Sequence, residues 1–197
     1  VGIDTKMPVC IAPVGLTGMQ HADGEMHAAM AAKKFGIPFT LSTMSICSIE
    51  DVAAHTQAPF WFQLYMIRDR RVIEDLLQRA SANGCTTLVF TVDLPFPGMR
   101  HRDTRNGMST PGLRGALTKA RQLAARPGWI WDVGVKGKPH SFGNFTQAVP
   151  DANDLNTFKQ WVDAQFDGSV TWRDIEWLRR IWKGKLVLKG IQEVEDA

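Results

Sequence analysis

Two polar side chains follow a buried apolar run near the middle of the chain. Residues 88–90 are Leu, Val and Phe, and Thr91 and Asp93 come directly after them. On a β-strand, residues two apart point to the same face, so Thr91 and Asp93 would share one side of a sheet. A carboxylate placed where a buried strand emerges has a desolvation cost, which a partner or a function must offset. Asp93 is therefore a candidate acid or base, or the partner of Arg100 in a structural ion pair.

The same arrangement recurs at the ends of other predicted strands. Apolar runs at 9–12, 39–43, 60–65, 87–93 and 185–190 predict five strands. The candidate groups at or after the other four ends are Pro13, Val14, Gly15, Ser42, Thr43, Gln63, Tyr65 and Lys189. Each alone has a simpler interpretation, such as a hydroxyl bonded to local backbone or a solvated lysine. Their recurrence over consecutive strands favours one common site.

Helices are predicted between these strands. Residues 24–35 are strong helix formers ended by a glycine, and Ser48, Asp69 and Thr171 each precede a helical pattern as N-caps. Alternating strands and helices predict a parallel sheet covered by helices. Functional groups at successive strand ends favour a (β/α)8 TIM barrel, and no Gly-x-Gly-x-x-Gly follows the first strand as in a doubly wound sheet. We predict an α/β fold in which residues 1–197 form a single, incomplete barrel domain with about five of its strands.

Composition excludes several classes of protein. The 197 residues are 44% hydrophobic and 22% charged, which is typical of a globular domain. No apolar run approaches the ~18 residues that a membrane-spanning helix needs. Cys10, Cys47 and Cys85 are odd in number and lack metal-ligand spacing, so we expect buried thiols and neither a disulfide scaffold nor a metal site.

A long basic insertion, residues 106–149, interrupts the pattern after the fourth strand. It contains six basic residues and one acidic residue, whereas the whole chain has a net charge of only +3. One helical face and the segment after it would be apolar: Leu113, Leu117, Ala120, Ala124, Trp129, Ile130 and Trp131. A basic amphipathic helix followed by tryptophans predicts peripheral membrane contact. A surface loop on the barrel and a lid over the site are the alternatives, and no nucleic-acid recognition fold accompanies the charge.

Five short motifs together resemble one enzyme family. They are Ile11-Ala12-Pro13-Val14-Gly15, Leu41-Ser42-Thr43, Phe62-Gln63-Leu64-Tyr65, Phe90-Thr91-Val92-Asp93 and Leu188-Lys189-Gly190-Ile191. In combination they resemble the FMN-dependent L-2-hydroxy-acid dehydrogenases and oxidases, over essentially the whole chain. Segments 39–43, 61–65 and 98–103 are most similar to the bacterial membrane-associated L-lactate dehydrogenases. The resemblance implies FMN as cofactor and oxidation of an L-2-hydroxy acid, with L-lactate to pyruvate as the expected reaction.

The resemblance also implies roles for the candidate residues. The backbone at 13–15 would approach the flavin N5 edge, where a glycine permits close contact. Ser42, Gln63 and Thr91 would hydrogen-bond the isoalloxazine ring, and Lys189 would place a positive charge near N1 and O2.

Three residues would act on the substrate. Tyr65 would orient the substrate oxygen, and Arg100 would bind the substrate carboxylate. Asp93 would pair with an imidazole base and favour its protonated form.

The family's catalytic histidine, its second carboxylate-binding arginine and its FMN-phosphate motifs would lie beyond the fifth strand. None of the five histidines in this sequence matches the base. The resemblance further implies a membrane quinone as electron acceptor, a homotetramer, and a peripheral position on the cytoplasmic side of the inner membrane.

Several alternatives stay open. The substrate could be mandelate or glycolate, or oxygen could be the acceptor. The chain could be a barrel aldolase with Lys189 as Schiff-base nucleophile, or an inactive fragment.

Overall fold

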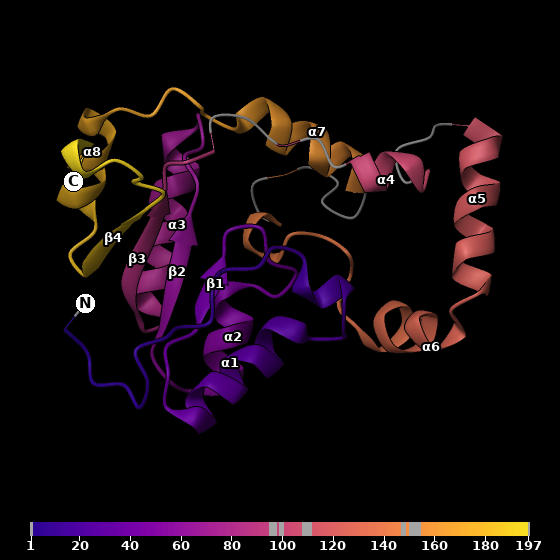
Figure 1. The fold of residues 1–197 in the computed structure, drawn as a ribbon, viewed down its shortest axis with the longest axis horizontal. Helices are drawn as coiled ribbons and strands as arrows, with labels where there is room; N and C mark the ends of the chain where they lie inside the picture. The colour runs from indigo at the N-terminus through magenta and orange to yellow at the C-terminus, as the bar shows by residue number, and fades with distance from the viewer. Residues whose placement is uncertain are drawn as a thin grey trace.

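Four parallel strands form the central sheet (Figure 1). The computed structural model describes residues 2–94, 98, 101–107, 112–146, 149 and 155–196. The strands are β1 (Thr40–Ser42), β2 (Phe60–Leu64), β3 (Cys85–Thr91) and β4 (Lys185–Lys189). Each strand pairs in parallel with the next one along the chain, so their order in the sheet is β1-β2-β3-β4. A sheet that never reverses its strand order is built like a barrel wall and unlike a doubly wound sheet.

Helices connect the strands as predicted, with additions between β3 and β4. The long helices before β3 and directly before β4 are α1 (Gly24–Phe35), α2 (Ile49–Thr56), α3 (Arg70–Ala82) and α8 (Trp172–Ile181). The β3–β4 connection also contains α4 (His101–Arg105), α5 (Gly112–Ala124), α6 (Pro127–Trp129) and α7 (Leu155–Gln165). Shorter helical segments are η1 (Thr17–Met19), η2 (Ile130–Lys136), η3 (Gly143–Phe145) and η4 (Val194–Asp196). Helix α7 has no counterpart in the sequence-based prediction.

The predicted strand at 9–12 is reduced to a single parallel bridge between Ile11 and Phe39. The Ile11 N–H donates to the Pro38 carbonyl (2.9 Å), and the Thr40 N–H donates to the Ile11 carbonyl (3.1 Å). Its position beside β1 is as predicted, but its length is wrong. Pro38 has no N–H to extend the ladder, and β1 itself has only three residues. Cys10 in this segment is exposed, so the prediction that all three thiols are buried is also wrong.

The two faces of the sheet have different characters. Leu41, Phe62, Leu88 and Phe90 are fully buried and belong to the same core cluster as residues of α1, α2 and α3. Strand alternation places the other residues of each strand on the opposite face, where several are polar. This second face becomes the lining of the site described below.

Helix starts follow the local chemistry predicted for them. The Ser48 hydroxyl accepts from the Asp51 N–H (3.1 Å), and the Asp51 carboxylate accepts from the Ser48 N–H (2.9 Å), which completes a capping box for α2. The Asp69 carboxylate accepts from the Arg71 N–H at the start of α3 (3.0 Å). At α8, the Asp174 carboxylate accepts from the Thr171 N–H (2.9 Å).

The basic insertion has two parts with different surroundings. Helix α5 lies on the side of the molecule opposite β4 (Figure 1), and Leu113 and Leu117 on it are 78% and 63% exposed. The later part packs on the barrel: the Trp129 indole N–H donates to the Met19 carbonyl (2.9 Å), and Lys138 pairs with Asp51 (2.8 Å). Val133, Phe145 and Val149 are buried. Among the described helices, none is both long and apolar enough to cross a bilayer.

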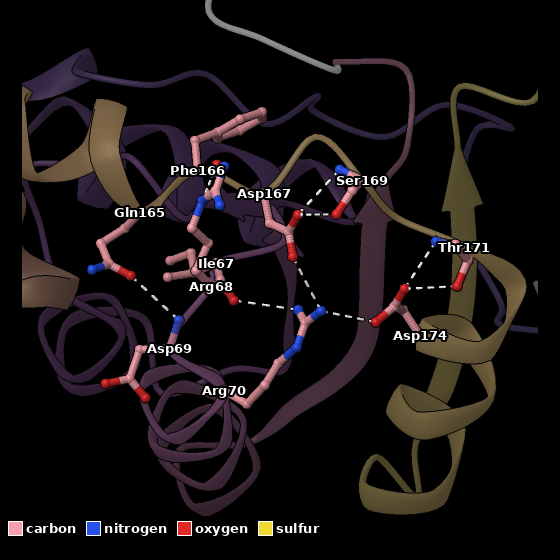
Figure 2. Close-up of polar contacts among 10 residues, drawn as sticks. All are labelled: Ile67, Arg68, Asp69, Arg70, Gln165, Phe166, Asp167, Ser169, Thr171 and Asp174. Atoms are coloured by element: carbon pink, nitrogen blue, oxygen red, sulfur yellow. Dashed lines mark hydrogen bonds and ion pairs between the residues drawn. The ribbon is translucent and has the colours of Figure 1, made fainter.

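Arg70, the first residue of α3, binds both the segment before α8 and the first turn of α8 (Figure 2). Its guanidinium donates to Asp167 (3.2 Å), to Asp174 (2.8 Å) and to the Ile67 carbonyl (3.3 Å), and it lies over the Trp177 ring. Backbone bonds support the same contact, since the Asp167 N–H donates to the Met66 carbonyl (3.1 Å). The loop that follows β2 is therefore held by residues about a hundred positions later in the chain.

We expect Arg70→Ala to lower the free energy of unfolding by about 1–3 kcal/mol, because two carboxylates and a carbonyl lose a charged donor. Arg71→Ala is the matched control. Its side chain is 88% exposed in a pair with Asp69, and solvent screens an exposed pair so that it adds little to stability. Urea unfolding of both variants checks this, and equal effects would contradict a special role for Arg70.

Candidate active site

The carboxyl ends of the four strands bring most of the predicted site residues together. The register pairs Ser42 with Gln63 across β1 and β2, and Thr91 with Lys189 across β3 and β4. Gln63 pairs with Val89, which lies two residues before Thr91 and on the same face. Ser42, Gln63, Thr91 and Lys189 therefore line one face at one end of the sheet, opposite the apolar core.

A chain of hydrogen bonds connects three of these residues. The Ser42 hydroxyl donates to Gln63 Oε1 (3.3 Å), and Gln63 Nε2 donates to Thr91 Oγ1 (3.0 Å). All three side chains are buried. The Gln63 carboxamide thus links three strands, with a hydroxyl at each end that can either donate or accept.

Thr43 fixes Gln63 from the side. Its N–H donates to Gln63 Oε1 (3.4 Å), and its hydroxyl donates to the Gln63 carbonyl. The same hydroxyl accepts from the Tyr65 N–H (3.3 Å). Thr43 is fully buried. The sequence placed it at a strand end beside Ser42, but the family resemblance assigned it no contact.

Asp93 and Lys189 form an ion pair across β3 and β4. Lys189 Nζ lies 3.5 Å from Asp93 Oδ2, and the side chains are 46% and 31% exposed. Gly190 (φ +109°) packs against Asp93 so closely that an added Cβ would lie 2.5 Å from the Asp93 Cβ. Glycine is therefore required after Lys189, both for the positive φ and for the approach to Asp93. Arg100, the sequence-predicted partner of Asp93, lies outside the described residues.

Tyr65 directly follows β2, and its phenol lies close enough to Asp93 to sense the charge of that carboxylate. Its ring packs on Phe166 with ring centroids 5.8 Å apart. Burial, and then the negative charge of Asp93, raise the pKa of the Tyr65 phenol above its ordinary value. Tyr65 is thus a neutral hydroxyl at neutral pH, able to donate a hydrogen bond to an oxygen atom.

The 13–15 segment passes beside the end of β1. The Leu16 N–H donates to the Met44 carbonyl (2.9 Å), and a Cβ added to Gly15 would lie 3.4 Å from Met44 and 4.0 Å from Ser42 Oγ. Gly15 and Val14 are exposed. The backbone of this segment is therefore accessible next to the hydroxyl that begins the hydrogen-bond chain.

The residues present fit a flavin ring by their chemistry. An isoalloxazine edge alternates nitrogen and carbonyl oxygen atoms, and the strand ends offer two hydroxyls, a carboxamide and an ammonium group in one row. The exposed glycine backbone at 15 allows a planar ring to approach closely.

The fold and these strand ends define a (β/α)-barrel domain with a polar site at the carboxyl edge of its sheet. The model of the FMN-dependent dehydrogenase family matches residues 1–197, so the chain belongs to this family. This confirms the predicted barrel fold and FMN as the family's cofactor.

The chain is similar to two L-lactate dehydrogenases in sequence and to a mandelate dehydrogenase in structure. The chain is 52% identical over 196 residues to the L-lactate dehydrogenase of Caulobacter vibrioides, which covers 100% of this chain and 51% of that protein. It is 50% identical over 192 residues to the L-lactate dehydrogenase of Acinetobacter baumannii, covering 98% and 50%. A crystal structure of (S)-mandelate dehydrogenase, a monotopic membrane protein, superposes with a TM-score of 0.84 at 36% identity, covering 98% of this chain and 50% of that one. The chain thus spans about half the length of these relatives.

We expect Asp93→Asn to lower the pKa of Tyr65, because removing the negative charge makes the phenolate easier to form. Tyrosinate absorption during an alkaline titration measures this pKa, with Tyr65→Phe as the blank. Asp4→Asn, which removes an exposed carboxylate in the N-terminal segment, serves as the matched control. A Tyr65 pKa that is the same in Asp93→Asn and in the parent protein would contradict the assignment.

Proposed function

We propose that the protein containing this chain oxidises L-lactate to pyruvate with FMN as cofactor. The observation that carries the proposal is the buried Ser42–Gln63–Thr91 hydrogen-bond chain with Lys189 beside it. The identities of 52% and 50% to two L-lactate dehydrogenases favour lactate over other 2-hydroxy acids. Family membership favours flavin chemistry over the aldolase alternative. When bound, FMN would supply the acceptor for the hydride equivalent that leaves the substrate carbon.

The cofactor-facing residues hold and polarise the ring edge. We assign Ser42, Gln63 and Thr91 to hydrogen bonds with ring nitrogen and oxygen atoms, and the backbone at 13–15 to the N5 edge. Lys189 would supply a fixed positive charge beside the bound ring.

The substrate-facing residues orient the hydroxy acid and manage a proton. Tyr65 donates its phenolic hydrogen to a substrate oxygen, and Arg100 binds the carboxylate. Among the described residues, Lys189 contacts Asp93 Oδ2. We assign Asp93 Oδ1 to the imidazole of a histidine base supplied from outside these residues, whose protonated form it would stabilise.

We further propose a peripheral membrane location on the cytoplasmic side of the inner membrane, a quinone as electron acceptor, and a homotetramer. Support for the membrane contact comes from the exposed leucines of α5 and from the likeness to a monotopic membrane protein. Exposed apolar side chains interleaved with basic ones suit a surface of anionic lipid.

The function is tested by anaerobic reduction of the purified, FMN-loaded full-length protein with a panel of 2-hydroxy acids. We expect stoichiometric FMN and faster bleaching of flavin absorption by L-lactate than by mandelate or glycolate. Preferential bleaching by mandelate would assign the substrate differently, and a protein without flavin would refute the proposal.

Lys189→Met tests the assigned cation. We expect flavin reduction to slow about tenfold to a hundredfold, since charged hydrogen bonds contribute about 1.5–3 kcal/mol. Lys183→Met removes an exposed lysine that bonds only the Arg180 carbonyl among the described contacts, and serves as the control. Equal rates in the two variants would remove Lys189 from the site.

Leu113→Glu combined with Leu117→Glu tests the membrane contact. We expect binding to anionic vesicles to fall at least tenfold, because each leucine buries apolar area worth about 1.5–3 kcal/mol. The control is Val194→Glu, which changes an apolar side chain that is 91% exposed outside the insertion. Vesicle co-sedimentation that is unchanged in the double variant would reject α5 as the contact.

A further inference from the structure

Asn144, near the end of the basic insertion, is buried against the loop that follows β1. Its residue is 2% exposed. The side-chain Nδ2 donates to the Ser42 carbonyl (3.2 Å), the Thr43 carbonyl (3.2 Å) and Ser45 Oγ (3.0 Å). The side-chain Oδ1 accepts from the Ile49 N–H (2.9 Å) at the first residue of α2. One carboxamide thus bonds both ends of the β1–α2 connection.

The polarity around Asn144 allows only one residue type of this size. Its neighbours on the nitrogen side include two carbonyl oxygens, which need a donor, and its neighbour on the oxygen side is an N–H, which needs an acceptor. Leucine or alanine would leave buried backbone groups without partners, and aspartate would place a charge against carbonyl oxygens. The contact is therefore specific to the amide.

The backbone on either side holds Asn144 in place. The Gly143 N–H donates to the Ser45 carbonyl (3.1 Å), and a Cβ added to Gly143 would lie 2.5 Å from the Ile46 carbonyl oxygen. The Asn144 carbonyl accepts from the Arg79 guanidinium (2.9 Å), which also pairs with Glu50. Arg79 of α3 thus binds the Asn144 backbone, while the Asn144 side chain binds the loop after β1.

Two of the residues that Asn144 binds, Ser42 and Thr43, also bond Gln63 in the Ser42–Gln63–Thr91 row. Ser42 begins the Ser42–Gln63–Thr91 chain through its hydroxyl, and Asn144 binds its carbonyl. Thr43 bonds the Gln63 side chain and carbonyl through its N–H and hydroxyl, and Asn144 binds its carbonyl as well. A shift at Asn144 is therefore transmitted to Gln63 through two adjacent residues.

We propose that Asn144 is a positioning residue that sets the Ser42–Gln63–Thr91 row against the flavin ring, so that the insertion completes the cofactor site. This inference rests on the proposed flavin function. It assigns the later part of the insertion to the site, separately from any membrane contact made by α5.

Asn144→Ala in the full-length protein is the test, with Asn83→Ala as the matched control. Asn83 is a half-buried asparagine whose side chain donates to the Arg79 carbonyl at the end of α3, away from the loop after β1. We expect Asn144→Ala to raise the FMN dissociation constant about tenfold or more and to shift the flavin absorption bands, as expected for buried groups left without partners. Asn83→Ala is expected to leave both unchanged. Flavin binding and spectra are compared below the unfolding temperature of each variant, so that a loss of stability alone does not move them.

Amide hydrogen exchange of residues 42–49 gives a readout that needs no flavin. We expect faster exchange there in Asn144→Ala apoprotein than in Asn83→Ala. If Asn144→Ala does not fold, Asn144→Ser, which keeps a donor and an acceptor, replaces it, and failure of both to fold would make the contact purely structural and overturn the proposal. Unchanged FMN affinity and spectra in a folded variant would also overturn it. Parent protein that binds no FMN would instead refute the proposed function, while the exchange at 42–49 would still report on the contact.

Discussion

The Gln63 carboxamide is the interaction on which the rest of the site depends. It is buried on the polar face of the sheet and bonds neighbours on both adjacent strands, Ser42 on β1 and Thr91 on β3. A buried amide with unsatisfied ends costs about 1–3 kcal/mol, so the two hydroxyls contribute to the stability of the sheet edge. The sheet can place them because parallel strands in unbroken order bring consecutive carboxyl ends to one edge. The register then decides which side chains meet.

Loops rather than strands hold this edge together from outside. The loop after β1 is bound by Asn144, and the loop after β2 is bound by Arg70 through Asp167 and Asp174 (Figure 2). Both contacts come from the β3–β4 connection, so this long connection supports two strand ends that precede it. The charged pair Asp93–Lys189 lies further along the same edge, where β4 pairs with β3 alone among the described strands.

Features set by neighbouring residues could be predicted from the sequence. The caps at Ser48, Asp69 and Thr171 could be predicted because each uses a side-chain oxygen that lies only two or three residues from the backbone N–H that it accepts from. The strand ends could be found because buried apolar runs stop at polar residues. The predicted strand length at 9–12 was wrong because that length depends on β1 and Pro38, which no local pattern reveals. The ion pair of Asp93 with Lys189, which are 96 positions apart, likewise depends on register.

Asn144 shows where sequence reasoning stops. It lies in the basic insertion, whose charge and tryptophans predict a membrane contact. Nothing near Asn144 in the sequence indicates a contact with the strand ends. Only the fold brings it to Ser42, 102 positions earlier. A lone asparagine in a connecting segment is ordinarily a turn former or a solvated side chain.

Some polar groups of the basic insertion bind the barrel, and others are exposed to solvent. Lys138 pairs with Asp51, and the Trp129 indole N–H donates to the Met19 carbonyl, so both side chains are bonded to the barrel. Trp131 is 60% exposed with Lys136 over its ring, and the leucines of α5 face outward beside Arg114 and Arg121. The exposed large apolar side chains of the insertion therefore lie on α5 and η2, whereas Phe145 and Val149 further along are buried. One insertion thus combines exposed apolar and basic side chains on α5 with a buried segment around Asn144 that packs on the loop after β1, about twenty residues further along the chain.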